Sequence, residues 1–166
     1  MPHAFGGFPA DGVGPANGNL VMDSAGNLYG ATRTGGTSKS CNGLGFTCGT
    51  IFKLTATSGG QWKETVLYSF QSVATGFFPG AGVTLDSAGN IYGTTANGGS
   101  TSCACGVVYK LAPNSDGTWT YTVLHSFAGS DGDLPVANLV LHNGNLYGTT
   151  ATGGSGGGGV VFEIAP

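Results

Sequence analysis

The segment Leu85-Asp86-Ser87-Ala88-Gly89-Asn90-Ile91-Tyr92-Gly93-Thr94-Thr95 occurs in three versions along this 166-residue chain. The version at residues 22–32 reads Met-Asp-Ser-Ala-Gly-Asn-Leu-Tyr-Gly-Ala-Thr. The version at residues 141–150 is shorter by one and reads Leu-His-Asn-Gly-Asn-Leu-Tyr-Gly-Thr-Thr. Self-similarity at an almost fixed period is the sequence signature of a repeat architecture, so this segment indicates a repeat fold.

Matched positions on both sides extend each version into a unit of about 55–65 residues. The Tyr-Gly pair recurs with spacings of 63 and 55 residues. The upstream prolines are Pro15, Pro79 and Pro135, the downstream diglycines begin at Gly35, Gly98 and Gly153, and the following apolar runs cover residues 49–54, 106–111 and 159–164. We therefore predict one repeat domain over residues 1–166, divided into unit one (5–69), unit two (70–126) and unit three (127–166).

The apolar runs have the character of strands. They are short, rich in β-branched and aromatic residues and bounded by Gly, Asn, Asp or Pro, and no segment has a long helical period. The sequence Asp86 to Gly89 predicts a tight turn between two strands, because Asp bonds to its own backbone and Gly adopts positive φ. The shorter Asn143-Gly144 suits a two-residue hairpin turn. Each unit is thus predicted to form a four-stranded antiparallel meander.

Four short strands at this period are typical of one blade of a β-propeller, so we predict an all-β, propeller-type fold with three blades. Units one and two end in a strand led by Trp62 or Trp119, whereas unit three has no such strand. Residues 1–5 resemble the end of a fourth strand, as in residues 124–127. Three blades are fewer than the four to eight that close a ring. We therefore expect a homo-oligomer in which two or three copies close a ring, or a head-to-tail filament.

The composition excludes several classes of function. The net charge is −3 and only 8% of residues are charged, which argues against nucleic-acid binding because that needs a clustered basic surface. No apolar run is long enough to insert into a membrane. Four cysteines in a chain this poor in charge indicate an oxidising, extracytoplasmic location, secreted or at the cell surface. The opening residues lack the features of a signal peptide, so we expect either that one was removed or that the chain is part of a longer protein.

Several motifs in order give the chain a family resemblance. Leu-Tyr-Ser-Phe at 67–70, the segment 85–95, Asn-Gly-Gly at 97–99 and Gly-Val-Val-Tyr-Lys-Leu at 106–111 together resemble the GloVer tandem-repeat family. The resemblance implies a bacterial, exported, propeller-like repeat protein, and it implies no catalytic residues. The chain departs from the pattern in having three units and no visible anchor. Its third unit also lacks the cysteines and the turn aspartate.

The cysteines lie in equivalent loops, which favours disulfides within each loop, Cys41–Cys48 and Cys103–Cys105. A bridge across one intervening residue is cramped, since disulfides prefer Cα atoms roughly 5.5–6 Å apart. Pairs between units, such as Cys41 with Cys103, therefore stay open. The C-x6-C and C-x-C spacings fit a zinc site poorly, so no metal is expected.

Tyrosines that recur in all units are the candidates for ligand binding. Tyr29, Tyr92 and Tyr147 would stack on sugar rings, with Asn97 from a Gly-rich loop as a hydrogen-bond partner. The alternative is that these rings pack between neighbouring blades, because alternation directs one face of each strand toward a neighbour. A surface rich in Tyr, Asn, Thr and Gly suits an uncharged glycan better than an anionic one.

Residues that would support catalysis or a cofactor are not evident. Asp23 and Asp86 are interpreted as turn formers rather than calcium ligands, because their turn offers few further oxygen donors. His3, His125 and Glu64 each replace another residue type in the sister units, and such positions are interpreted as surface positions. We therefore predict no enzyme and no cofactor.

Three functional hypotheses follow from the sequence. The first is a non-catalytic extracellular module that binds a glycan or a protein partner. The second is a structural subunit whose function is its own assembly into a ring or filament. The third and weakest is a hydrolase or lyase with a site in the central channel of the propeller.

Overall fold

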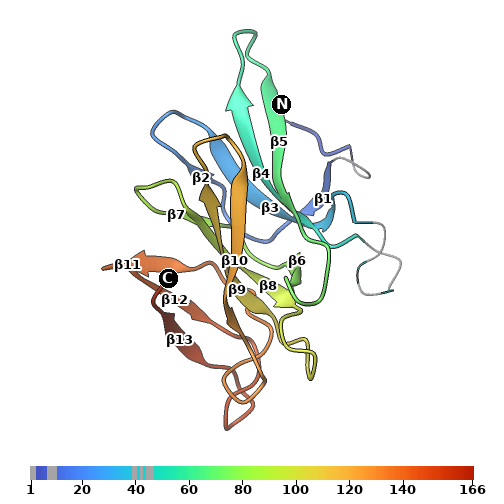
Figure 1. The fold of residues 1–166 in the computed structure, drawn as a ribbon, viewed down its shortest axis with the longest axis vertical. Coiled ribbons are helices and arrows are strands. Elements are labelled where there is room, and N and C mark those ends of the chain that lie inside the picture. The colour runs from blue at the N-terminus through green and yellow to red at the C-terminus, as the bar shows by residue number, and fades with distance from the viewer. Residues whose placement is uncertain (1–2, 7–10, 39–40, 42, 44–46) are drawn as a thin grey trace.

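The chain folds into three antiparallel sheets that follow one another along the sequence (Figure 1). The computed structural model describes residues 3–6, 11–38, 41, 43 and 47–166. Sheet 1 contains β1 (Gly12–Pro15), β2 (Val21–Met22), β3 (Leu28–Gly35), β4 (Thr50–Ala56) and β5 (Trp62–Ser69). Sheet 2 contains β6 (Phe77–Pro79), β7 (Thr84–Leu85), β8 (Ile91–Asn97), β9 (Val107–Pro113) and β10 (Trp119–Ser126). Sheet 3 contains β11 (Val140–His142), β12 (Asn145–Thr149) and β13 (Val161–Ile164).

The strand order confirms the predicted meander. Sheet 1 runs β1-β3-β4-β5 with β2 also paired to β3, and sheet 2 repeats this order as β6-β8-β9-β10 with β7 on β8. In units one and two, the single inner strand that was expected is instead two short pieces on the same edge, β1 with β2 and β6 with β7. The first piece ends at Pro15 or Pro79, because proline has no N–H to continue the ladder. Sheet 3 has the order β11-β12-β13, and the three sheets do not close into a ring.

The repeated segment forms the predicted hairpins. Asp86 Oδ1 accepts hydrogen bonds from the backbone N–H groups of Ala88 and Asn90, both at 2.9 Å, and Gly89 adopts a φ of 83°. In the shortened version, Asn143 and Gly144 both have positive φ, 49° and 84°, as a two-residue primed turn requires. The hairpin is thus kept although its turn residues differ.

Side-chain alternation gives every sheet two faces, which we call front and back. The front face of sheet 2 packs against the back face of sheet 1, and the front face of sheet 3 packs against the back face of sheet 2; we call each contact a seam. The first seam buries Tyr29 and Ile51 from sheet 1 against Val83, Ile91, Tyr109 and Leu111 from sheet 2. The second seam buries Tyr92 and Val108 from sheet 2 against Leu139 and Leu146 from sheet 3. The core of the protein therefore lies between the sheets.

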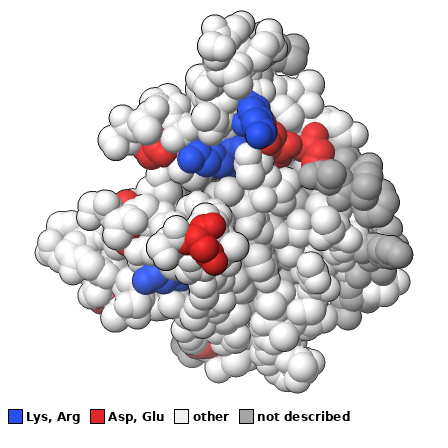
Figure 2. All heavy atoms as spheres, turned by 45° about the horizontal axis from the view of Figure 1, so that its top comes forward, with Lys and Arg blue, Asp and Glu red and all other residues white. Residues whose placement is uncertain are grey.

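The surface carries few charges. Figure 2 shows Lys, Arg, Asp and Glu side chains as small isolated groups on an otherwise uncharged face. None of the described residues form a helix, and so none form one long and apolar enough to cross a membrane.

Candidate functional site

In the described part of the chain, no sheet covers the front face of sheet 1 or the back face of sheet 3. On the back faces, Ile51 and Val108 are fully buried at their seams, whereas the equivalent Val161 of sheet 3 is 81% exposed. On the front faces, Val83 and Leu139 are 2% and 5% exposed, whereas the equivalent Leu20 of sheet 1 is 50% exposed. These two positions are therefore buried inside the chain and exposed at its two ends, whereas Phe52 and Leu54 on the front face of sheet 1 are buried like their equivalents in sheet 2.

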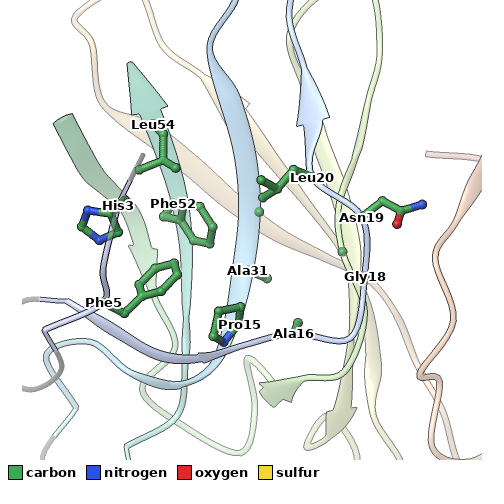
Figure 3. A pocket seen from close by; sticks show the side chains of 12 residues that line it. His3, Phe5, Pro15, Ala16, Gly18, Asn19, Leu20, Ala31, Phe52 and Leu54 are labelled. Carbon is green, nitrogen blue, oxygen red and sulfur yellow. The ribbon is translucent and has the colours of Figure 1, made fainter. Parts of the chain in front are cut away.

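An apolar hollow of about 260 Å³ lies on the open front face of sheet 1. Figure 3 shows the rings of Phe5 and Phe52 beside one another, with Leu20 and Leu54 above them and Pro15 below. The hollow is lined by His3, Phe5, Pro15, Ala16, Gly18, Asn19, Leu20, Gly30, Ala31, Phe52, Leu54 and Gly82. Its lining contains one ionisable side chain, His3, so it suits an apolar side chain better than a charged ligand.

The segment around Phe5 occupies the place that the residues after β5 and β10 occupy on the following sheets. Phe5 contacts Phe52 of β4 edge to face, with ring centroids 5.2 Å apart. Phe127, which follows β10, contacts Phe162 of β13 in the same way at 5.1 Å. Phe70, which follows β5, contacts the equivalent Tyr109 at 5.5 Å. The phenylalanines that follow β5 and β10 therefore each pack on the front face of the next sheet, and Phe5 occupies this position on sheet 1.

Three side chains of metal-ligating type meet beside this hollow. His3 Nε2 lies 3.3 Å from Glu64 Oε2 and 3.7 Å from Asp11 Oδ2. One ligand atom from each residue lies within 4.8 Å of the others. The Glu64 side chain is only 10% exposed, and the side chains of His3 and Asp11 are 18% and 19% exposed. We call these residues the His3–Asp11–Glu64 cluster.

Burial and proximity perturb both carboxyl groups of the cluster. Burial, a hydrogen bond with Asp11 and the negative charge of Asp11 together raise the pKa of Glu64 to about 8. Burial also acts to raise the pKa of Asp11, but hydrogen bonds from Glu64, Gly6 and Gly12 outweigh it and lower that pKa. At neutral pH and without other ligands, Glu64 therefore holds a proton and Asp11 is ionised.

Sequence reasoning interpreted His3 and Glu64 as surface positions, and this was wrong. Glu64 stands where unit two has Tyr121, and His3 stands where unit one ends with Tyr68. At the first seam, these tyrosines stack with ring centroids 4.2 Å apart, and both are partly buried. The signal available in the sequence was that a histidine and a carboxylate replace tyrosines of the repeat at these two positions.

The comparison with known families rests on the same repeat units. A family model described as the Gloeobacter/Verrucomicrobia repeat matches residues 2–166. The chain belongs to this family. The Gloeobacter/Verrucomicrobia repeat thus accounts for nearly the whole chain and confirms the resemblance inferred from the motifs. A comparison with curated proteins finds no match.

In this Gloeobacter/Verrucomicrobia repeat, each cysteine pairs within its own loop. Cys41 bonds Cys48, with Cα atoms 5.0 Å apart, and Cys103 bonds Cys105, with Cα atoms 5.2 Å apart. The bridge over one residue is accommodated because Ala104 adopts a φ of 53°, in the left-handed region. Two disulfides are consistent with an oxidising, extracytoplasmic environment.

The structure separates the four residues predicted to bind a ligand. Tyr29 and Tyr92 are only 6% and 3% exposed, each in a seam and each with its hydroxyl bonded to the turn aspartate at 3.0 Å. Tyr147 is partly exposed on the open back face of sheet 3. Asn97 ends β8 and pairs with Phe77. These positions favour the packing interpretation for Tyr29 and Tyr92, and stacking on sugars stays a prediction.

Proposed function

We propose that this protein is a non-catalytic, extracytoplasmic repeat module of β-propeller type, whose sheets act as blades and whose function is to dock onto further copies of itself. The observation that carries the proposal is the exposure of Val161 and Leu20 at positions that are buried in both internal seams. Exposed apolar faces of this kind mark sites of association.

The internal seams supply the template for the contact. In each of them, a back face with a Tyr and a β-branched residue meets a front face with aliphatic and aromatic side chains. The open back face of sheet 3 carries Tyr147 and the exposed Val161, and the open front face of sheet 1 carries the exposed Leu20 beside the apolar hollow, in which Phe52 and Leu54 are buried. The two open faces therefore have the complementary chemistry of a seam, and the occupant that fits each of them is a second copy.

The contact is heterologous, because two different faces meet. Such contacts give a closed ring when the rotation between copies closes and a filament when it does not. Two or three copies with three blades each would form a ring of six or nine blades. A closed ring covers every apolar face, whereas a filament leaves one open face at each end.

Binding of an uncharged glycan is the second candidate function. It is supported by the scarcity of charged side chains on the surface (Figure 2). A glycan array tests it directly, and binding that is lost in Tyr147→Ala would support a role for the exposed tyrosine.

Two variants, each with one open face blocked by a charge, test the proposed docking. Leu20→Lys places a charge on the front face only, and Val161→Lys places one on the back face only. Because burying an unpaired charge is costly, each variant alone should be monomeric. An equimolar mixture should form a dimer and nothing larger, since the mixture contains one intact front and one intact back face per pair.

Ser58→Lys, in the exposed turn between β4 and β5, is the control and should assemble as the parent protein does. Sedimentation velocity measures the oligomeric state of the two variants, of their mixture and of the control. The proposal is contradicted if the mixture stays monomeric, or if either variant alone assembles like the parent.

A further inference from the structure

The His3–Asp11–Glu64 cluster differs from the rest of the repeat in ways that the proposed docking does not use. Its ligands come from three separate segments: His3 lies in the N-terminal segment, Asp11 directly precedes β1, and Glu64 lies in β5. Two of its buried polar atoms, His3 Nε2 and Glu64 Oε1, have no hydrogen-bond partner among the described residues. Buried polar atoms are nearly always satisfied, so this pair calls for a ligand.

From this geometry, we propose that the His3–Asp11–Glu64 cluster binds one divalent transition-metal ion, with Zn²⁺ as the fitting ion. Zn²⁺ binds imidazole nitrogen and carboxylate oxygen at about 2.0–2.2 Å, and a tetrahedron with such bonds has edges of about 3.3–3.5 Å. The distances from His3 Nε2 to the carboxylate oxygens are 3.3 and 3.7 Å. Two of the three ligand–ligand distances are therefore close to those of a tetrahedral site, and the third is within 4.8 Å.

The cluster is held by its surroundings. The backbone N–H groups of Gly6 and Gly12 donate hydrogen bonds to the Asp11 carboxylate, the latter at 2.6 Å. The His3 ring rests edge to face on Phe5, with centroids 4.9 Å apart. Supporting contacts of this kind orient metal ligands and raise affinity. Three protein ligands leave a fourth position on the ion for water or an incoming donor.

The equivalent places at the two seams show what the cluster replaces. At the first seam, the same place holds the stacked rings of Tyr68 and Tyr121. At the second seam, His125 Nε2 bonds Asp131 Oδ2 at 2.8 Å, but no third ligand joins them in the described part of the chain. The repeat therefore provides one complete ligand set and one incomplete set on the same scaffold.

Zinc titration of the full chain tests the proposal. The oxidised protein without an affinity tag is titrated with Zn²⁺ by calorimetry, and one saturable site is expected. His3→Ala, Asp11→Asn and Glu64→Gln should each weaken binding at least 10-fold, since even the loss of a supporting contact costs about 10- to 100-fold. His125→Ala, the matched control, should bind as the parent does. A thousandfold excess of Ca²⁺ should not compete, because Ca²⁺ prefers all-oxygen sites.

Near-UV circular dichroism of each variant without metal shows whether its fold is intact, and Zn²⁺ should raise the melting temperature of the parent protein but not of the folded cluster variants. The absence of a saturable site in the parent protein would overturn the proposal. Binding that persists within a few-fold in any folded cluster variant, or that is lost in His125→Ala, would also overturn it and would indicate adventitious surface binding only.

Discussion

The turn aspartate and its replacement show how single residues keep the hairpin constant. Asp86 accepts hydrogen bonds from Ala88 and Asn90 backbone N–H groups, from Asn90 Nδ2 at 2.7 Å and from Tyr92 Oη at 3.0 Å. In sheet 3 the aspartate is replaced by His142. Glu163 of β13 is the acceptor instead, and it accepts hydrogen bonds from Tyr147 Oη at 2.9 Å and from the Asn145 side chain. Glu163 stands where β4 and β9 have Lys53 and Lys110, so two substitutions in unit three compensate each other.

A charge exchange in unit three tests this compensation. Glu163→Lys alone should lower the melting temperature, because Tyr147 and Asn145 lose their acceptor. Adding His142→Asp should restore it, because the pair then matches Asp86 and Lys110 of unit two. Thermal denaturation of the two single variants and the double variant measures the coupling. Additive effects of the two changes would contradict the exchange.

The turn aspartates also predict an acid dependence. Burial acts to raise the pKa of Asp23 and Asp86, but hydrogen bonds from Asn27 and Asn90 and from the neighbouring tyrosines outweigh it and lower both pKa values below 3.8. A lowered folded-state pKa stabilises the protein fully above the unfolded-state value, and the contribution is lost as the pH falls through the folded-state value. The free energy of unfolding should therefore decline below about pH 4. In Asp23→Asn/Asp86→Asn, urea denaturation should show a smaller decline over the same range.

The two disulfide loops are equivalent elements of different size. Cys41 and Cys48 are fully buried and seven residues apart, whereas Cys103 and Cys105 are two residues apart. Loop-closure entropy gives about 2–2.5 kcal/mol for the larger loop and about 1–1.5 kcal/mol for the smaller one. Cys41→Ala/Cys48→Ala should thus cost more than Cys103→Ala/Cys105→Ala in guanidinium denaturation. An equal or reversed order would contradict this account of the loops.

The strands and turns could be predicted from sequence because equivalent positions in the three units can be compared with one another. Three versions of residues 85–95 indicated the hairpins, and the alternation of apolar runs indicated the meander. The split of each inner strand at Pro15 and Pro79 was missed, although proline's lack of an N–H could have indicated it. The His3–Asp11–Glu64 cluster was missed for a different reason. Alignment identifies equivalent positions, but it does not show which side chains from different units meet across a seam.

At the scale of the whole molecule, backbone contact joins sheet 1 to sheet 2. A Cβ on Gly18 would lie 1.6 Å from the backbone nitrogen of Gly82, so only glycine permits this approach. Gly18→Ala should destabilise the protein by about 1–3 kcal/mol or more. Gly59→Ala, which has nothing within 4 Å, should stay within about 0.5 kcal/mol of the parent protein. Equal losses of unfolding free energy in Gly18→Ala and Gly59→Ala, measured by chemical denaturation, would contradict a close backbone contact between sheets 1 and 2.

The molecule as a whole is an open stack of sheets whose end faces match its internal seams. The N-terminal segment lies beside sheet 1 and the C-terminal strand belongs to sheet 3 (Figure 1), so the two open faces lie at opposite ends of the stack. Docking between copies would continue the stack through the same contacts that hold it together. The central claim is therefore that seams form between chains as they do within one chain.

Sedimentation equilibrium of the unmodified protein tests this claim most directly. The chain has a mass of 16.4 kDa. We expect the particle mass to be a whole multiple of this value. It should be two or three times this value for a closed ring, and for a filament it should increase with protein concentration. A mass of 16.4 kDa at every concentration up to the solubility limit would contradict it.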